Sequence, residues 1–166
     1  MTDSMLTPSR LWKQMTSEQR LQAARAFWLD DQGADEQIQA ALLISQRKKF
    51  RPKTVMSLDD ERKARHLASL SSLPDPLATR ALIAYHLTEQ RPMMSAFLDA
   101  LGIAHDNGLI KDNDVKPESS QVAAAAASLA GQFPADHVSL YLNTLLLQDR
   151  DTWGALEGIA QLAAAR

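Results

Sequence analysis

The stretch that most constrains the fold is residues 75–110, because it contains start and stop signals for two successive helices. Asp75-Pro76 predicts a helix start, since aspartate caps free backbone N–H groups and proline costs no hydrogen bond in the first turn. Arg91-Pro92 interrupts the chain, and Gly102 lies where a left-handed C-terminal cap is expected. The predicted helices span residues 76–89 and 92–101.

The second of these helices has apolar residues at i, i+4 and i+8, which is the spacing of a core-facing stripe. Paired methionines can also line an adaptable binding groove, but at helical spacing they favour core packing. We therefore expect this stripe to be buried. Its members are Met93, Met94, Phe97, Leu98 and Leu101.

Composition predicts an all-α fold, because glycine and β-branched residues are few and helix formers dominate. The chain is long enough to bury one core, so we expect a single domain over residues 1–166 with about seven to nine helices and no sheet. These helices should form an irregular bundle or orthogonally packed pairs. The polar, turn-rich residues 108–120 are the one candidate division of the chain.

Several local patterns predict further structure. Ile38, Ala41 and Leu42 mark the expected inner face of a helix over residues 35–48. Residues 50–56 predict an irregular link held by proline, and Ser57 begins a capping-box pattern for the next helix. A last helix is expected over residues 152–164.

Cofactor and membrane chemistry find little support in the sequence. The absence of cysteine excludes disulfides and thiolate metal sites, and it is compatible with a reducing cytoplasm. No apolar run approaches the length of a membrane span, so we expect a soluble, cytoplasmic protein. We expect no cofactor, because no known nucleotide or catalytic motif is present.

A basic cluster follows the predicted helix 35–48. Five cations surround an aromatic residue within residues 47–53, a pattern that could contact phosphates and stack a base, or bind an acidic protein surface. Cations at a helix C-terminus also complement the helix dipole. The net charge of −2 disfavours nucleic acid. The candidate binding residues are Arg47, Lys48, Lys49, Arg51 and Lys53.

The adjacent His105-Asp106 pair follows an apolar stretch. It resembles locally the central motif of the HD-type metal phosphohydrolases, which are also all-helical. The resemblance implies that His105 and Asp106 ligate a divalent metal, which activates water for attack on phosphorus. It also requires a histidine upstream and an aspartate downstream. The available residues are His66 or His86, and Asp114 or Asp136. The alternative is a helix end followed by an Asp-Asn-Gly turn.

His86 is a second candidate acid–base group, near Tyr85 and Arg91 at the join of the two central helices. The structural alternative is a hydrogen-bonded histidine that packs within its helix.

Since no strong catalytic constellation is present, we expect a non-enzymatic protein that binds a protein partner or self-associates as a homodimer. Two helices carry apolar residues on more than one side, and excess apolar surface of this kind often marks an interface. The alternatives are an HD-like phosphohydrolase and a nucleic-acid-binding protein that uses residues 47–53.

Overall fold

The computed structural model describes residues 7–111 and 116–157. Within these ranges the chain forms ten α-helices and one short 3-10 helix, and the only strands are two residues long. The predicted all-α class is therefore confirmed, with slightly more helices than expected. The expectation of no sheet is wrong at one small hairpin, described below.

Backbone contacts group the residues into two compact units, which divide between Thr88 and Glu89 near the end of one helix. The N-terminal unit is Thr7–Thr88, and the C-terminal unit comprises the described residues from 89 onward. The loop 108–120 belongs to the C-terminal unit. A single domain over the whole chain stays a prediction.

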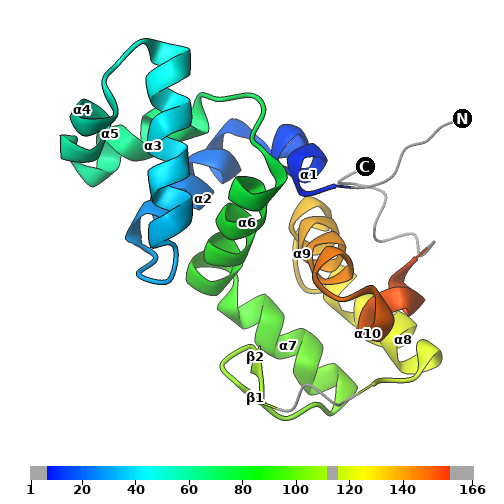
Figure 1. The fold of residues 1–166 in the computed structure, drawn as a ribbon. Coiled ribbons are helices and arrows are strands. Elements are labelled where there is room, and N and C mark those ends of the chain that lie inside the picture. Colours follow the sequence, from blue (N-terminus) through cyan, green and yellow to red (C-terminus); the bar gives the residue numbers. More distant parts are fainter. Residues whose placement is uncertain (1–6, 112–115, 158–166) are drawn as a thin grey trace, which may run out of the picture. The chain divides into compact units, whose positions relative to one another are not determined.

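The N-terminal unit contains six helices, drawn from blue to green in Figure 1. They are α1 (Pro8–Gln14), α2 (Ser17–Leu29), α3 (Ala34–Lys48), α4 (Pro52–Ser57), α5 (Asp60–Ala68) and α6 (Asp75–Glu89).

The centre of the N-terminal unit is the packing of α2 along α5. Thr16 begins α2 with a reciprocal capping box to Gln19, which satisfies two backbone groups at once. Phe27 and Trp28 of α2 are buried and meet edge to face, with ring centroids 5.2 Å apart. The buried Trp12 indole donates to the Leu70 carbonyl at 2.8 Å, which joins α1 to the end of α5.

Three local predictions in this unit are wrong. Residues 50–56 are not an irregular link, because Pro52 fits the first turn of α4 and Val55 supplies a buried anchor. The next helix is capped by Asp59, which accepts from the Arg62 N–H at 2.8 Å, and not by Ser57.

The third correction concerns the inner face of α3. Ala40, Ala41 and Ile44 are buried, whereas Ile38 and Leu42 are 55% and 46% exposed. The helix carries apolar side chains on two neighbouring faces, and packing within the unit uses only one of them.

The C-terminal unit begins with α7 (Arg91–Leu101), which starts one residue before the predicted start at Pro92. Gly102 then adopts the expected left-handed conformation with φ of 69°, and the Ile103 N–H returns to the Leu98 carbonyl at 3.0 Å. The remaining elements are β1 (His105–Asp106), β2 (Leu109–Ile110), α8 (Ser119–Ala130), α9 (Ala135–Gln148), α10 (Arg150–Trp153) and the 3-10 helix η1 (Gly154–Leu156).

The core of the C-terminal unit is built on the predicted stripe of α7, whose five apolar residues are all buried. Phe97 lies 5.7 Å, between ring centroids, from both Tyr141 of α9 and Trp153 of α10. Burial raises the pKa of the Tyr141 hydroxyl. The alanine-rich α8 packs against α7, as small side chains allow.

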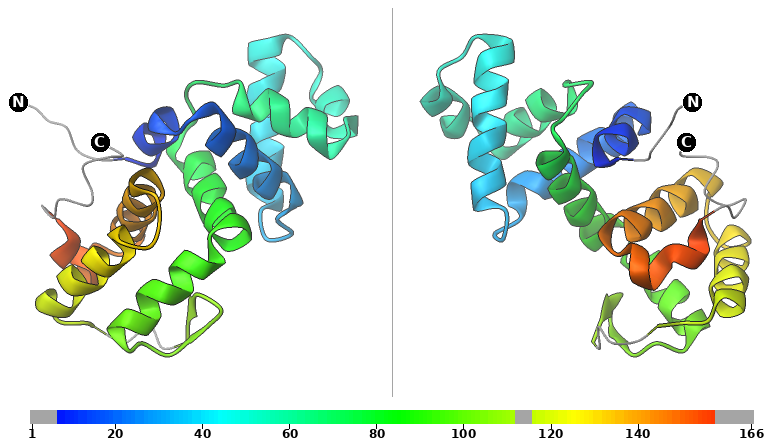
Figure 2. Two further views of the ribbon diagram at one scale, coloured as in Figure 1. Left: turned by 180° about the vertical axis from the view of Figure 1, so that it is seen from behind. Right: turned by 45° about the vertical axis from the view of Figure 1, so that its right-hand side comes forward.

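Strands β1 and β2 form an antiparallel hairpin that lies beside α7 (Figures 1 and 2). Asn107 and Gly108 both have positive φ, at 51° and 94°, as a two-residue type I′ turn requires. A Cβ atom at Gly108 would lie 2.8 Å from the Met94 Cβ, so glycine is also needed for the close approach to α7.

The last predicted helix, over residues 152–164, is wrong in its described part. α10 ends at Trp153, and η1 with a turn at Glu157 follows. Asp149 sets the start of α10, because its carboxylate accepts from the Thr152 N–H at 3.2 Å and from the Thr152 hydroxyl at 2.6 Å. The rest of the predicted helix lies outside the described residues.

Candidate functional site

The basic cluster, which is Arg47, Lys48, Lys49, Arg51 and Lys53, begins in the last turn of α3 and continues into α4. Lys49 ends α3 in a left-handed conformation with φ of 61°, which turns the chain sharply. Arg51 is the N-cap residue of α4, and Lys53 lies in its first turn. The five cations thus lie close together in the chain at the end of α3, at the left-handed residue after it, and at the start of α4.

All five cations of the basic cluster are exposed. In the part of the chain that the structure describes, none of them forms an ion pair. Their charges are therefore not balanced by a carboxylate of the chain in those ranges.

Phe50 fixes the position of the cluster against α5. Its ring meets the His66 ring edge to face, with centroids 5.2 Å apart, and its carbonyl accepts from the Ser45 hydroxyl. Partial burial and the nearby positive charge of Lys48 lower the pKa of His66. Phe50 remains 38% exposed, so part of the ring stays available beside the cations.

The helix dipole explains only part of the cluster. Arg47 and Lys48 lie in the last turn of α3, where a cation is stabilised by the negative end of the dipole. Arg51 and Lys53 lie at the start of α4, where the dipole disfavours a cation. The helix dipole therefore does not explain why positions 51 and 53 carry cations.

Exposed apolar side chains accompany the cluster on the same two helices. Ile38 and Leu42 of α3 and Met56 of α4 are 55%, 46% and 43% exposed. α3 stands in front of α2 and α5 in Figure 1 and behind them in the reversed view of Figure 2, so these helices cover it on one side. Sequence reasoning assigned Ile38 and Leu42 to the core and missed this exposed apolar surface. The apolar residues of α3 lie on two faces of the helix. Since only one face can pack against the core, this pattern could have indicated the exposed apolar surface.

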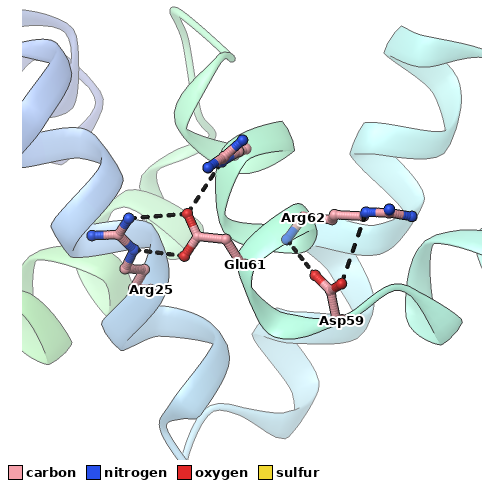
Figure 3. A network of polar contacts seen from close by, with 5 residues as sticks. Arg25, Asp59, Glu61 and Arg62 are labelled. Carbon is pink, nitrogen blue, oxygen red and sulfur yellow. Dashed lines mark hydrogen bonds and ion pairs between the residues drawn. The ribbon is translucent and has the colours of Figure 1, made fainter.

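A second group of charges in the N-terminal unit is fully paired (Figure 3). Arg25 of α2 donates two hydrogen bonds to the Glu61 carboxylate of α5, at 2.8 and 2.9 Å, and Arg65 donates a third at 3.1 Å. These hydrogen bonds lower the pKa of Glu61 to about 2. Asp59 pairs with Arg62 at 3.8 Å. These five residues form the paired network, in which the Arg25–Glu61 contact links α2 to α5.

The acidic residues before and within the first turn of α3 are partly paired. Arg80 of α6 contacts Asp30 at 3.6 Å and Glu36 at 3.5 Å. Asp35 forms no ion pair within the described ranges and is exposed.

The structure places His105 in β1, directly before the hairpin turn. Its Nδ1 accepts from the Gly108 N–H at 3.0 Å, so Nε2 carries the proton in the neutral ring and donates to Asp99 at 2.7 Å. Asp106 is exposed in β1. Both nitrogens of His105 therefore hold the turn together.

The other residues of the metal hypothesis do not form a site in the described part of the chain. No group of three or more His, Asp or Glu side chains there could hold a metal ion. His66 packs on Phe50, and Asp114 lies outside the described residues.

His86 lies in α6 and is buried. Its Nδ1 donates to the Leu82 carbonyl one turn earlier at 2.8 Å, because a carbonyl oxygen can only accept. Its ring also meets Tyr85, with centroids 5.1 Å apart. Arg91 donates to the Asn107 carbonyl at 2.8 Å and thereby ties α7 to the hairpin.

Comparison of the chain with protein-family models, with curated proteins and with solved structures gave no match. Among the helices that the structure describes, none has both the length and the apolar character that crossing a membrane requires. The exposed surface of α3 and α4 is therefore the best-defined candidate site, and its function is inferred from chemistry alone.

Proposed function

We propose that the chain is a non-enzymatic, cytoplasmic protein that binds an acidic segment of another protein through the basic cluster. The observation that carries the proposal is the presence of five exposed cations within residues 47–53 that have no anionic partner in the described chain. Arg51 and Lys53 strengthen it, because they lie where the α4 dipole disfavours them.

The partner should carry apolar side chains among its carboxylates. Phe50 and Met56 are partly exposed within and beside the cluster, and they would contact such side chains once the charges have met. A protein segment offers carboxylates for the cations and apolar side chains for both Phe50 and Met56. A nucleic acid offers phosphates and a base that stacks on Phe50, but no aliphatic side chain for Met56. This combination favours an acidic protein over nucleic acid.

The direct test is binding of a fluorescently labelled peptide with glutamates on one helical face and leucines on the other, measured by fluorescence anisotropy. The full-length chain should bind the peptide, and the affinity should fall as salt is added, because screening weakens exposed charge pairs. A peptide with lysine in place of glutamate should not bind.

A matched pair of variants locates the binding surface. Lys48→Gln with Lys53→Gln should weaken binding about tenfold, which corresponds to about 1.4 kcal/mol. Lys13→Gln with Lys111→Gln removes the same charge from exposed positions elsewhere and should leave binding unchanged. Lys13 and Lys48 both lie in the last turn of a helix, so the dipole contribution is matched as well.

Two results would overturn the proposal. Equal losses in the two double variants would show that net charge, not this surface, governs binding. Tighter binding of a labelled DNA duplex than of the acidic peptide, with a steep salt dependence, would assign the cluster to nucleic acid instead.

A further inference from the structure

The outward side of α3 carries a pattern that the acidic partner does not explain. Asp35, Ile38 and Leu42 lie within about 60° of one another around the helix at about 100° per residue. All three are exposed. Lys49 follows directly after the helix and is also exposed. We call these four residues the outer stripe.

The outer stripe carries opposite charges at equal distances on either side of Leu42. Asp35 precedes Leu42 by seven residues and Lys49 follows it by seven, which at a rise of about 1.5 Å places each near 10 Å from the centre. In the described ranges neither Asp35 nor Lys49 forms an ion pair. An apolar centre therefore lies between an anion at one end and a cation at the other.

We propose that two copies of the chain associate through an antiparallel pairing of their α3 helices, with a twofold axis at Leu42. A twofold interface brings one patch against itself, so residue i meets j and residue j meets i. In this arrangement Asp35 of each copy faces Lys49 of the other, and the two Leu42 side chains meet at the axis. Each Ile38 lies opposite the exposed Gln46 of the other copy. Both end charges gain a partner, and the exposed apolar side chains leave water.

A second copy fits this stripe better than an unrelated partner does. A helix that complements it must carry an anion, an apolar centre and a cation in reverse order, and α3 itself meets that requirement. The helices would cross at the shallow angle of side-by-side packing, because a steep crossing would separate the ends. One helix pair buries an area at the low end for stable complexes, so the dimer should be weak.

The outer stripe shares Lys49 with the basic cluster, but the two proposals are tested on different residues. The test variants for that partner change Lys48 and Lys53, whereas this pairing depends on Asp35, Leu42 and Lys49. Failure of one proposal can therefore be recognised without failure of the other.

Sedimentation equilibrium of the full chain over a range of concentrations tests the pairing. The average mass should rise from 18.3 kDa towards twice that value. Asp35→Lys alone and Lys49→Asp alone should each weaken association at least tenfold, because both twofold-related contacts become repulsive. Leu42→Glu should have a similar effect.

The decisive arm is a mixture of Asp35→Lys chains with Lys49→Asp chains. Across the twofold axis, each contact in such a mixed pair joins opposite charges, so mixing should restore the dimer that neither variant forms alone. This recovery also shows that both variants fold.

A chain that stays monomeric at every concentration would overturn the pairing. So would a dimer that survives all three substitutions, since it would use another surface, and a mixture that remains monomeric.

Discussion

Two groups of charges in the N-terminal unit differ in whether their members form ion pairs within the described chain. In the paired network, Arg25 and Arg65 surround Glu61, and every charged group has a partner within a few residues or on the facing helix. In the basic cluster, five cations follow one another without an anion in the described chain. The first group holds α2 to α5. The cations of the second group remain available to bind an anionic partner molecule.

The comparison shows that charge density alone does not distinguish a structural cluster from a binding surface. The cations of both groups are exposed, and both groups lie at helix ends or on helix surfaces. What separates them is partner geometry, since Arg25 and Glu61 meet across 36 positions of sequence. A cation is available for binding only when the fold leaves it without such a partner.

The largest expected effect comes from reversing charge in the basic cluster. Arg51→Glu with Lys53→Glu should weaken binding of the acidic peptide by roughly a hundredfold, because two attractions become repulsions. Arg62→Glu with Arg65→Glu makes the same charge change inside the paired network. It should lower stability and leave binding nearly unaltered, as anisotropy and thermal unfolding would show.

Glu61→Gln should lower the midpoint of thermal unfolding by a few degrees, because Arg25 and Arg65 lose the negative charge and one of the two acceptor oxygens that they share. Asp60→Asn provides the control, since among the described residues Asp60 forms an ion pair only with Lys63 of its own helix, at 3.6 Å. An Asp60→Asn effect as large as that of Glu61→Gln would remove the reason for treating the network as a link between helices.

Acid should weaken the paired network in a defined window. The pKa of Glu61 is lowered from 4.5 to about 2, so its contribution is complete above pH 4.5 and is lost as the pH falls towards 2. Urea unfolding at a series of pH values should show this loss in the parent chain. In Glu61→Gln the slope over that window should be smaller, and an identical slope would contradict the assignment.

His66 adds a separate dependence at higher pH. Its pKa is lowered from 6.5, so the folded state binds the proton less readily than the unfolded chain does. Its contribution is therefore complete above pH 6.5 and declines as the pH falls below that value. Replacing Lys48 with glutamine should reduce this decline, because Lys48 is one cause of the shift. NMR titration of the His66 ring would measure it.

The smallest effect concerns the dipole of α4. Lys53→Glu should stabilise the fold by about 0.3 kcal/mol, because an anion replaces a cation at the helix start. The same change should weaken peptide binding. A loss of stability would show that Lys53 has a structural role after all.

Much of the fold could be predicted because its signals are local. The break at Pro92 and the left-handed Gly102 depend only on their own backbone conformations, and the structure has both as expected. The hairpin at Asn107-Gly108 was visible only as a turn, since two residues on either side carry no strand pattern. α4 was missed because a proline that can break a helix can equally begin one.

For the candidate site, too, the sequence predicts the local features but not those that depend on distant parts of the chain. The five cations could be named from the sequence, because they lie within seven residues of one another. Their lack of partners could not, since pairing depends on where distant helices lie. The exposure of Ile38 and Leu42 was hidden by the neighbouring apolar residues Ala40, Ala41 and Ile44, which offered an equally good inner face.

The most direct test of the account measures peptide binding and thermal unfolding side by side in two variants. Lys48→Gln with Lys53→Gln should bind the acidic peptide about tenfold more weakly and unfold at nearly the parental temperature. Arg25→Gln should unfold at a lower temperature and bind as the parent does. If Arg25→Gln loses binding, or if the lysine variant loses stability but not binding, the division between paired and available charges is wrong.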